Sequence, residues 1–451
     1  MKSALLSLLS LVGLTIISRA IANPVHNIQP QLDRWIEGQP GGIAMAWIDA
    51  DGAAFFQSGR MDNTDSRPIT PDTQFELGSI TKVFTALLLA ESERAGKVNR
   101  NDPAAKYLLP ADDPAQSALA KITLLALTTH TSGLPRMPGN LRIDATNAGD
   151  PYAAYDRAAL VAALRIHGPK ATVGEKVEYS NFGASVLGEA LAGAWSVSYA
   201  DALNEHVLVP LGLKATTLGI VGTRTSDQLA PGHAGGKRVP NWTFLACAPA
   251  GALRSSTRDM ALFLAACLGG DSEPLHAAFV TTMQPQHAMP DTGGEIALGW
   301  LIAGGKEKPI YWHNGATAGS HAFIGFDPRS GRGVVLLANV QKGMEDLGFS
   351  LLGLTPPKPA TKVANAVDFV GNYPFTPTFS IAVTAQDGSV FAQATAQPQF
   401  ALRPLSTDRF AVIGVSAEIS FDRGLDGKVS ALVLHQNGRD QRALRTVEEK
   451  K

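Results

Sequence analysis

The spacing of hydrophobic residues predicts different secondary structures in successive parts of the chain. Near the N-terminus, residues 43–48 and 53–57 are short apolar runs joined by the sequence DADG at residues 49–52, a pattern typical of a β-hairpin. A long region rich in alanine and leucine follows, in which apolar residues recur every three or four positions, as in amphipathic helices. The helices predicted in this region cover residues 79–95, 157–166, 184–194, 199–208 and 257–268.

Strand patterns return after the helical region, at residues 309–313, 321–327 and 333–338. Strands at both ends of a helical middle predict an α+β fold, in which one sheet is assembled from N- and C-terminal segments and is covered by a helical lobe. A crevice between the sheet and the lobe is then the expected place for a functional site.

The sequence TPPKP at residues 355–359 opens a proline-rich linker, which we assign to residues 355–364. Beyond it the predicted strands are short, and Asp-Gly or Asn-Gly pairs separate several of them. Residues 365–451 are therefore predicted to form a separate, small antiparallel β-barrel or sheet. The strands predicted there cover residues 379–384, 390–395, 417–421, 429–435 and 441–444.

The first 22 residues are typical of a secretory signal peptide. Lys2 gives a positive start, residues 4–17 are apolar, and the sequence AIA at residues 20–22 fits a cleavage site. A membrane anchor is the alternative, but the apolar run is shorter than the roughly 20 residues that cross a bilayer. We expect cleavage after residue 22, a periplasmic or secreted mature chain, and no stable membrane span.

Composition excludes several classes of protein. The chain has 39 basic and 40 acidic residues, and 45% of its residues are hydrophobic, so it is neither a polycationic nucleic-acid binder nor a disordered chain. Cys247 and Cys267 are its two cysteines, which can either form a disulfide or be buried thiols. The histidines do not cluster at the spacing of metal ligands, and we expect no metal and no cofactor.

The sequence GSITK at residues 78–82 places reactive groups at the start of a predicted helix. Apolar residues follow at helical spacing, so Ser79 is expected in the first turn, with Lys82 three residues on and on the same face. A lysine with the ordinary pKa of about 10.4 is protonated, but burial penalises the charged form and lets the amine accept the serine proton. Alone, this pair also fits an ordinary helix with a solvent-facing lysine.

A second group of polar residues, Tyr179-Ser180-Asn181, lies just before another predicted helix. The Tyr179 phenol is a candidate proton relay for Ser79, and nearby cations would help it to lose its proton. The Asn181 amide can bond both a lysine and a substrate carbonyl. Taken alone, the same residues also fit a structural role at a helix start.

A third group, His313-Asn314-Gly315, lies at the end of a predicted strand. Gly315 permits close approach to the strand, and the N–H of Ala316 can join that of Ser79 as an oxyanion hole. A lone histidine on a strand is also common as a buried structural residue, so this group gains weight from its position after the other two.

The three groups occur in the order Ser-x-x-Lys, Tyr-Ser-Asn and His-x-Gly, separated by 100 and 134 residues, and resemble the motifs of the penicillin-recognising serine hydrolases. This superfamily includes class C β-lactamases, DD-peptidases, D-aminopeptidases and related esterases. The stretches LTTHTSGLP at residues 127–135, PLGL at 210–213 and AGAL at 250–253 are also similar to family sequences. The resemblance covers about residues 30–345.

For the fold, the resemblance implies a β-lactamase/transpeptidase-like antiparallel sheet with a helical lobe over residues 23–354. Residues 365–451 resemble the lipocalin-like domains attached to some peptidases of this superfamily.

For the mechanism, the resemblance implies an acyl-enzyme. Ser79 would attack a carbonyl carbon, while Lys82 and Tyr179 would manage its proton. The oxyanion would rest on the amides of Ser79 and Ala316. The substrate-binding residues implied are Asn181, His313, Asn314 and Gly315.

The third motif departs from class C β-lactamases, which usually have lysine where this chain has His313. Histidine, with an ordinary pKa of about 6.5, offers a substrate carboxylate much less charge at neutral pH. His313 therefore favours a peptidase, aminopeptidase or esterase, whereas Asn181 is shared with β-lactamases and DD-peptidases.

We predict a β-lactamase that acts on a small-molecule substrate, a β-lactam or a D-Ala-containing peptide, and has no nucleic-acid partner. The alternatives are a D-amino-acid peptidase or DD-carboxypeptidase, an esterase, and a penicillin-binding sensor that does not hydrolyse its ligand. The sequence leaves the oligomeric state open.

Overall fold

The computed structural model describes residues 27–144, 146–166, 168, 172–269, 274–289, 293–354, 362–376, 379–386, 388–395, 399–412, 417–424, 426–436 and 439–446. The predicted signal peptide and residues 355–361 of the predicted linker lie outside the described residues, and both assignments stay predictions. In the described part of the chain, no helix is both long enough and apolar enough to cross a membrane.

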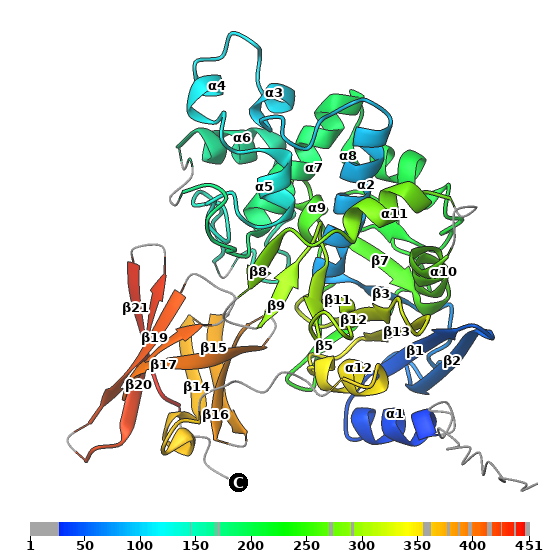
Figure 1. Cartoon of the computed structure of the whole chain (residues 1–451). Coiled ribbons are helices and arrows are strands. Elements are labelled where there is room, and N and C mark those ends of the chain that lie inside the picture. Colours follow the sequence, from blue (N-terminus) through cyan, green and yellow to red (C-terminus); the bar gives the residue numbers. More distant parts are fainter. Residues whose placement is uncertain are drawn as a thin grey trace, which may run out of the picture.

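An antiparallel sheet of eight strands forms the centre of the larger domain, in the order β2-β1-β13-β12-β11-β10-β9-β8 (Figure 1). The N-terminal hairpin pairs directly with β13, so segments from both ends of this domain share one sheet, as predicted. The strands are β1 (Gly42–Asp49), β2 (Gly52–Gly59), β8 (His287–Met289), β9 (Gly294–Ile296), β10 (Leu301–Ala303), β11 (Ile310–Ala316), β12 (His321–Asp327) and β13 (Arg332–Ala338).

Both faces of this sheet are buried at strands β1, β12 and β13. Helices α1 (Ile28–Ile36) and α12 (Glu345–Leu351) cover one face, and α10 (Thr257–Leu268) packs on the other face, against β1 and β13. Successive residues of β1 point to opposite faces, as the two-residue period of a strand requires. Ala44, Ala46 and Ile48 join the core below the helical lobe, and Ile43, Met45 and Trp47 join the core below α1 and α12.

The helical lobe follows the predicted pattern closely. The predicted helices 157–166 and 257–268 coincide with α6 and α10, whereas the predicted helix 199–208 divides into α8 and a π-helical turn, η3. Cys247 and Cys267 are buried free thiols in this region. The remaining helices are α2 (Thr81–Arg94), α3 (Ala105–Leu108), α4 (Ala115–Ala118), α5 (Leu124–Thr128), α6 (Arg157–Ile166), α7 (Asn181–Trp195), α8 (Tyr199–Leu203), η3 (Asn204–Leu208), α9 (Ala248–Gly251) and α11 (His276–Thr282).

Two small sheets lie beside the lobe. One has the order β3-β7-β4 and the other pairs β5 with β6. Their strands are β3 (Gln74–Glu76), β4 (Thr217–Leu218), β5 (Gly232–Ala234), β6 (Lys237–Val239) and β7 (Leu253–Ser256).

The C-terminal residues form a second domain, an antiparallel barrel whose eight strands pair in sequence order from β14 to β21. A bridge between Asn372 and Thr446 brings the last described residues to the first strand, so the barrel is nearly closed. This confirms the predicted barrel, while its likeness to lipocalins stays a prediction. Its elements are η4 (Ala366–Phe369), β14 (Gly371–Thr376), β15 (Phe379–Gln386), β16 (Ser389–Ala394), β17 (Gln399–Ser406), β18 (Arg409–Val412), β19 (Ala417–Arg423), β20 (Val429–Gln436) and β21 (Arg439–Leu444).

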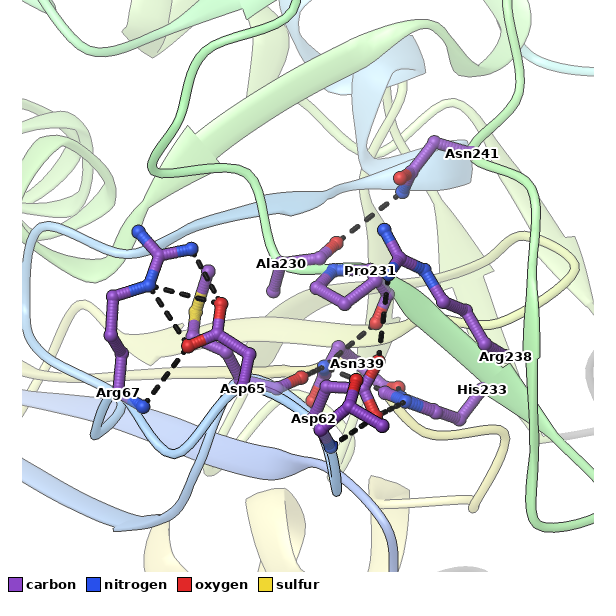
Figure 2. A network of polar contacts seen from close by, with 11 residues as sticks. Asp62, Asp65, Arg67, Ala230, Pro231, His233, Arg238, Asn241 and Asn339 are labelled. Atoms are coloured by element: carbon purple, nitrogen blue, oxygen red, sulfur yellow. Dashed lines mark hydrogen bonds and ion pairs between the residues drawn. The ribbon is translucent and has the colours of Figure 1, made fainter.

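A buried asparagine at the end of β13 ties several segments together (Figure 2). The Asn339 amide nitrogen donates to the carbonyls of Met61 and Pro231 at 2.8 Å each, and its oxygen accepts from the N–H of Gly42 at 2.7 Å. The Nδ1 of His233 lies 2.9 Å from the Asn339 carbonyl, and its Nε2 lies 3.6 Å from Asp62. The side chain of Asn339 therefore links β1, β5 and the loop after β2.

We expect Asn339→Ala to lower the free energy of unfolding by about 2–4 kcal/mol, because it leaves buried backbone groups without a partner. Urea unfolding measures this difference. The matched control is Asn63→Ala, at an exposed position in the same loop as Asp62, where we expect a change within about 0.5 kcal/mol. Equal effects of the two substitutions would contradict a structural role for the Asn339 network.

Candidate active site

A cavity of about 680 Å³ opens between the helical lobe, the β8–β9 end of the sheet and the barrel. Figure 1 shows the barrel beside β8 and β9. Five of the predicted site residues line the cavity, namely Ser79, Tyr179, Asn181, Asn314 and Ala316. The barrel contributes Phe391 from β16 and Gln399, Phe400 and Ala401 from β17.

Ser79 lies in a 3₁₀ turn, η2 (Gly78–Ile80), which precedes α2. The predicted start of the α-helix at Ser79 is therefore wrong by two residues. A 3₁₀ turn nearly superimposes residues three apart, which keeps Lys82 in line with Ser79. The Lys82 Nζ lies 3.1 Å from the Ser79 Oγ and donates to the Ala250 carbonyl at 2.6 Å.

Lys82 is almost completely buried, with 4% of its surface exposed. Burial is the larger cause, and the positive charge of Arg136 the smaller one, that holds the pKa of Lys82 well below its ordinary value. Its amine is thus far easier to deprotonate than that of a surface lysine, as the sequence predicted.

The hydroxyl of Tyr179 is hydrogen-bonded to Ser79, and the Lys82 Nζ lies 4.9 Å from the centre of the Tyr179 ring. Three residues far apart in the sequence therefore converge on one hydroxyl group. As expected, a nearby cation favours loss of the phenol proton, since the charge of Arg136 lowers the pKa of Tyr179, but burial has the larger effect. Burial outweighs the hydrogen bond to Ser79 and the charge of Arg136, and it raises the pKa of Tyr179 to about 12. At neutral pH Tyr179 carries its proton.

Ser180 and Asn181 begin helix α7. The Ser180 Oγ accepts from the N–H of Gly183 at 2.8 Å and caps the helix, which explains this serine structurally. The side-chain amide of Asn181 lines the cavity and donates to the sulfur of Met137 at 3.3 Å. The predicted bond from Asn181 to a lysine is not among the contacts of the described residues.

The third motif lies on β11, next to the turn that carries Ser79. A Cβ atom added to Gly315 would lie 1.9 Å from the Leu77 carbonyl oxygen and 2.9 Å from the Ser79 nitrogen. Gly78, with φ of +51°, also lies close to Ala316, since an added Cβ would lie 2.7 Å from the Ala316 nitrogen. The two glycines therefore let the backbones of β11 and the Ser79 turn approach each other closely near the nitrogens of Ser79 and Ala316.

We expect Gly315→Ala to slow acylation of Ser79 about a hundredfold, because the added methyl group displaces the Ser79 turn by a substantial part of an ångström. Labelling rates with a fluorescent penicillin measure the effect, and thermal unfolding verifies the fold. Gly168→Ala is the control, since nothing lies within 4 Å of the added Cβ there. A wild-type labelling rate for Gly315→Ala would show that the contact does not position Ser79.

His313 is buried, with 2% of its surface exposed, and its ring lies 6.4 Å from that of Tyr179. The Nδ1 lies 2.5 Å from the Asn314 carbonyl. Burial, and to a smaller extent the charge of Lys82, lower the pKa of His313 to about 3. The ring is therefore neutral at pH 7. His313 is not one of the described residues that line the cavity. Its role in substrate binding therefore stays a prediction.

Asn314 does line the cavity, and its amide nitrogen donates to Glu345 of α12 at 2.5 Å. Next to the motif, Thr317 donates to the buried carboxylate of Glu76 at 2.7 Å. Glu76 lies on β3, three residues before Ser79, so this bond fastens the first motif to the third.

The aromatic wall and the charged side chain of the cavity were not predicted from the sequence. Tyr152, Trp242 and Phe244 pack against one another, with the Tyr152 and Phe244 rings stacked at 5.1 Å. Arg136 directly follows the stretch LTTHTSGLP, so extending that stretch by one residue would have included it. Nothing in the sequence links Phe400 to this site, because it lies in the other domain.

Two family models match successive parts of the chain. A family model described as Beta-lactamase matches residues 28–349, and a domain of unknown function, DUF3471, matches residues 355–445. A β-lactamase of Yersinia enterocolitica is 26% identical over 354 residues, which span 71% of this chain and 87% of that protein. The D-alanyl-D-alanine-carboxypeptidase/endopeptidase AmpH of Escherichia coli is 27% identical over 345 residues, 70% of this chain and 86% of that protein.

A solved structure matches the fold over both domains. The octameric penicillin-binding protein homologue from Pyrococcus abyssi matches with a TM-score of 0.65 and 21% identity, over 93% of this chain and 99% of that one. The family match covers most of the larger domain and includes all three motifs. The chain therefore belongs to the β-lactamase family of penicillin-recognising serine hydrolases.

Proposed function

We propose that the chain is a periplasmic or secreted serine hydrolase of class C type, which opens the amide bond of β-lactams through an acyl-enzyme. The observation that carries this proposal is the convergence on Ser79, whose Oγ lies 3.1 Å from the Lys82 Nζ and is hydrogen-bonded to Tyr179. A serine alone is a weak nucleophile, and it needs a neighbour that takes its proton.

In the proposed acylation step, Lys82 is the base. Its lowered pKa favours the neutral amine, the form that takes the proton from the Ser79 Oγ as the oxygen attacks the carbonyl carbon. Negative charge then develops on the carbonyl oxygen, which the amides of Ser79 and Ala316 stabilise. The contacts of Gly78 and Gly315 support this pairing of amides.

Tyr179 supplies the second proton transfer. As its phenol is neutral at pH 7, it donates a proton to the leaving nitrogen while the carbon–nitrogen bond breaks, and it recovers a proton from Lys82. A water molecule then attacks the acyl carbon, loses its proton through the same groups, and the Ser79 oxygen leaves with a proton. The Asn181 amide, which lines the cavity, is the proposed partner of the substrate's amide group.

A hydrolase of D-amino-acid peptides or of small esters is the second candidate. The specific observation in its favour is the neutral ring of His313, which offers no charge where class C β-lactamases usually have a lysine. The relative AmpH is named as a carboxypeptidase and endopeptidase, which also suits this candidate.

Steady-state assays distinguish the candidates. The substrates are a chromogenic cephalosporin, a carbapenem, a D-Ala-D-Ala peptide and a short-chain p-nitrophenyl ester. Turnover of the cephalosporin supports the β-lactamase, and turnover of the peptide or the ester alone supports the second candidate. A fluorescent penicillin that stays on Ser79 without release would instead identify a penicillin-binding sensor.

A further inference from the structure

A cationic side chain lies in the cavity next to the proposed nucleophile. Arg136 follows the loop after α5, and its backbone carbonyl accepts from the N–H groups of Asn181 at 2.9 Å and Phe182 at 3.1 Å. These bonds fix the Arg136 backbone to the start of α7, directly after Tyr179. Arg136 is the one arginine or lysine among the described residues that line the cavity.

Two aromatic rings from different domains hold its guanidinium group. The guanidinium carbon of Arg136 lies 5.2 Å from the centre of the Tyr179 ring and 5.4 Å from that of Phe400 on β17. Cation–π contacts of this length are favourable, and they cost arginine less hydration than they would cost lysine. The barrel therefore helps to place a charge beside the residue that is hydrogen-bonded to Ser79.

Burial disfavours the charged form of two other basic groups near Ser79. Burial lowers the pKa of Lys82 well below its ordinary value, and it lowers the pKa of His313 to about 3. Burial also lowers the pKa of Arg136, but a guanidinium starts so high that it stays protonated at neutral pH. The acidic residues that line the cavity are Glu295, Glu345 and Asp346, which belong to β9 and α12 rather than to the lobe.

We propose that Arg136, held between Tyr179 and Phe400 of the barrel, is the specificity-determining residue that binds a carboxylate of the substrate. A guanidinium matches a carboxylate geometrically, through two parallel N–H···O bonds, and it does so most strongly where water is excluded. The inference rests on the proposed function, since it concerns a substrate that Ser79 attacks. It gives the C-terminal domain a role in substrate choice.

Arylboronic acids test this inference, because they add reversibly to a reactive serine and need no turnover. Titration calorimetry on the full chain compares phenylboronic acid with its 3-carboxy and 4-carboxy derivatives. We expect wild type to bind the better carboxylated acid about tenfold or more tightly than phenylboronic acid. Arg136→Met should remove this preference, and Phe400→Leu should reduce it. Equal affinities in wild type, or an unchanged preference in Arg136→Met, would overturn the inference.

The controls separate this inference from the proposed function. Arg142→Met removes an exposed arginine of the same segment and should keep the wild-type preference. Ser79→Ala should abolish binding of all three acids. If binding survives in Ser79→Ala, or if wild type binds none of the acids, the proposed function fails and the inference fails with it. If binding needs Ser79 but ignores the carboxylate, only the inference fails.

Matched pairs of substrates determine whether Arg136 binds the carboxylate of a β-lactam or that of a peptide. The free acid of a chromogenic cephalosporin is compared with its methyl ester, and a D-Ala-D-Ala peptide is compared with its C-terminal amide. For each scaffold, the kcat/KM of the free acid is divided by the kcat/KM of its ester or amide. We expect Arg136→Met to lower this ratio by about tenfold or more for the scaffold whose carboxylate Arg136 binds. An unchanged ratio for both scaffolds contradicts the inference.

Discussion

Ser79→Ala is expected to abolish acylation and to lower turnover of any substrate by about 10⁴-fold or more, since the other groups of the site have no nucleophile to activate. Intact-protein mass spectrometry after incubation with a penicillin measures the covalent product directly. Wild type should gain the mass of one penicillin, and the variant should gain none. Ser79 is half-buried, and Lys82 keeps its bond to the Ala250 carbonyl in the variant, so little stability should be lost.

Ser256→Ala provides a matched serine control. Ser256 caps helix α10, where its side chain accepts from the N–H of Asp259 at 3.2 Å, and its loss should cost about 1 kcal/mol of stability. Acylation should proceed normally in that variant. A penicillin adduct on Ser79→Ala would mean that another residue is the nucleophile, and the proposed mechanism would have to be abandoned.

Secondary structure was predictable from the sequence where apolar residues repeat at one regular spacing along the whole helix or strand. Helices α6 and α10 match the predicted ranges because their buried faces repeat at helical spacing and their ends carry clear signals, such as the capping serine of α10. Strands β14, β17 and β18 of the barrel were missed. β17 includes Pro404 and half-exposed positions, so its apolar residues do not alternate cleanly.

Within the candidate site, the order of three motifs was enough to group residues that the structure brings together. The local geometry was not predictable in the same way. The 3₁₀ turn at Ser79 depends on the positive φ of Gly78 and on its contact with Ala316, a residue of another strand. The helical periodicity of residues 79–95 does not predict this turn or this contact, because the pattern depends on one segment of the chain alone.

The electrostatics depended on burial, which the sequence does not give. The charge of Arg136 lowers the pKa of Tyr179, in the direction expected from nearby cations, but removal of water raises this pKa by more. The meeting of Arg136, Tyr179 and Phe400 joins two loops and a strand of another domain. No local sequence pattern encodes such a contact.

Lys82→Met is expected to lower the rate of acylation by about 10²- to 10⁴-fold, since methionine fills similar space but cannot accept the proton of Ser79. In wild type the neutral amine is the active form. As the pH falls through the pKa of Lys82, the amine becomes an ammonium group and acylation slows, so wild type should show an acid limb. Because burial holds this pKa well below the ordinary lysine value, the acid limb should lie well below the pH at which a surface lysine titrates.

Stopped-flow acylation with a chromogenic cephalosporin from about pH 5 to about pH 9 measures this limb. It should disappear in Lys82→Met, and Lys82→Arg should be equally slow, because a guanidinium keeps its proton throughout this range. Lys214→Met, at an exposed lysine, is the control and should follow the wild-type profile. Tyr179, with its pKa raised to about 12, does not titrate in this window. An acid limb that persists in Lys82→Met would therefore assign the proton transfer to a group other than these two residues.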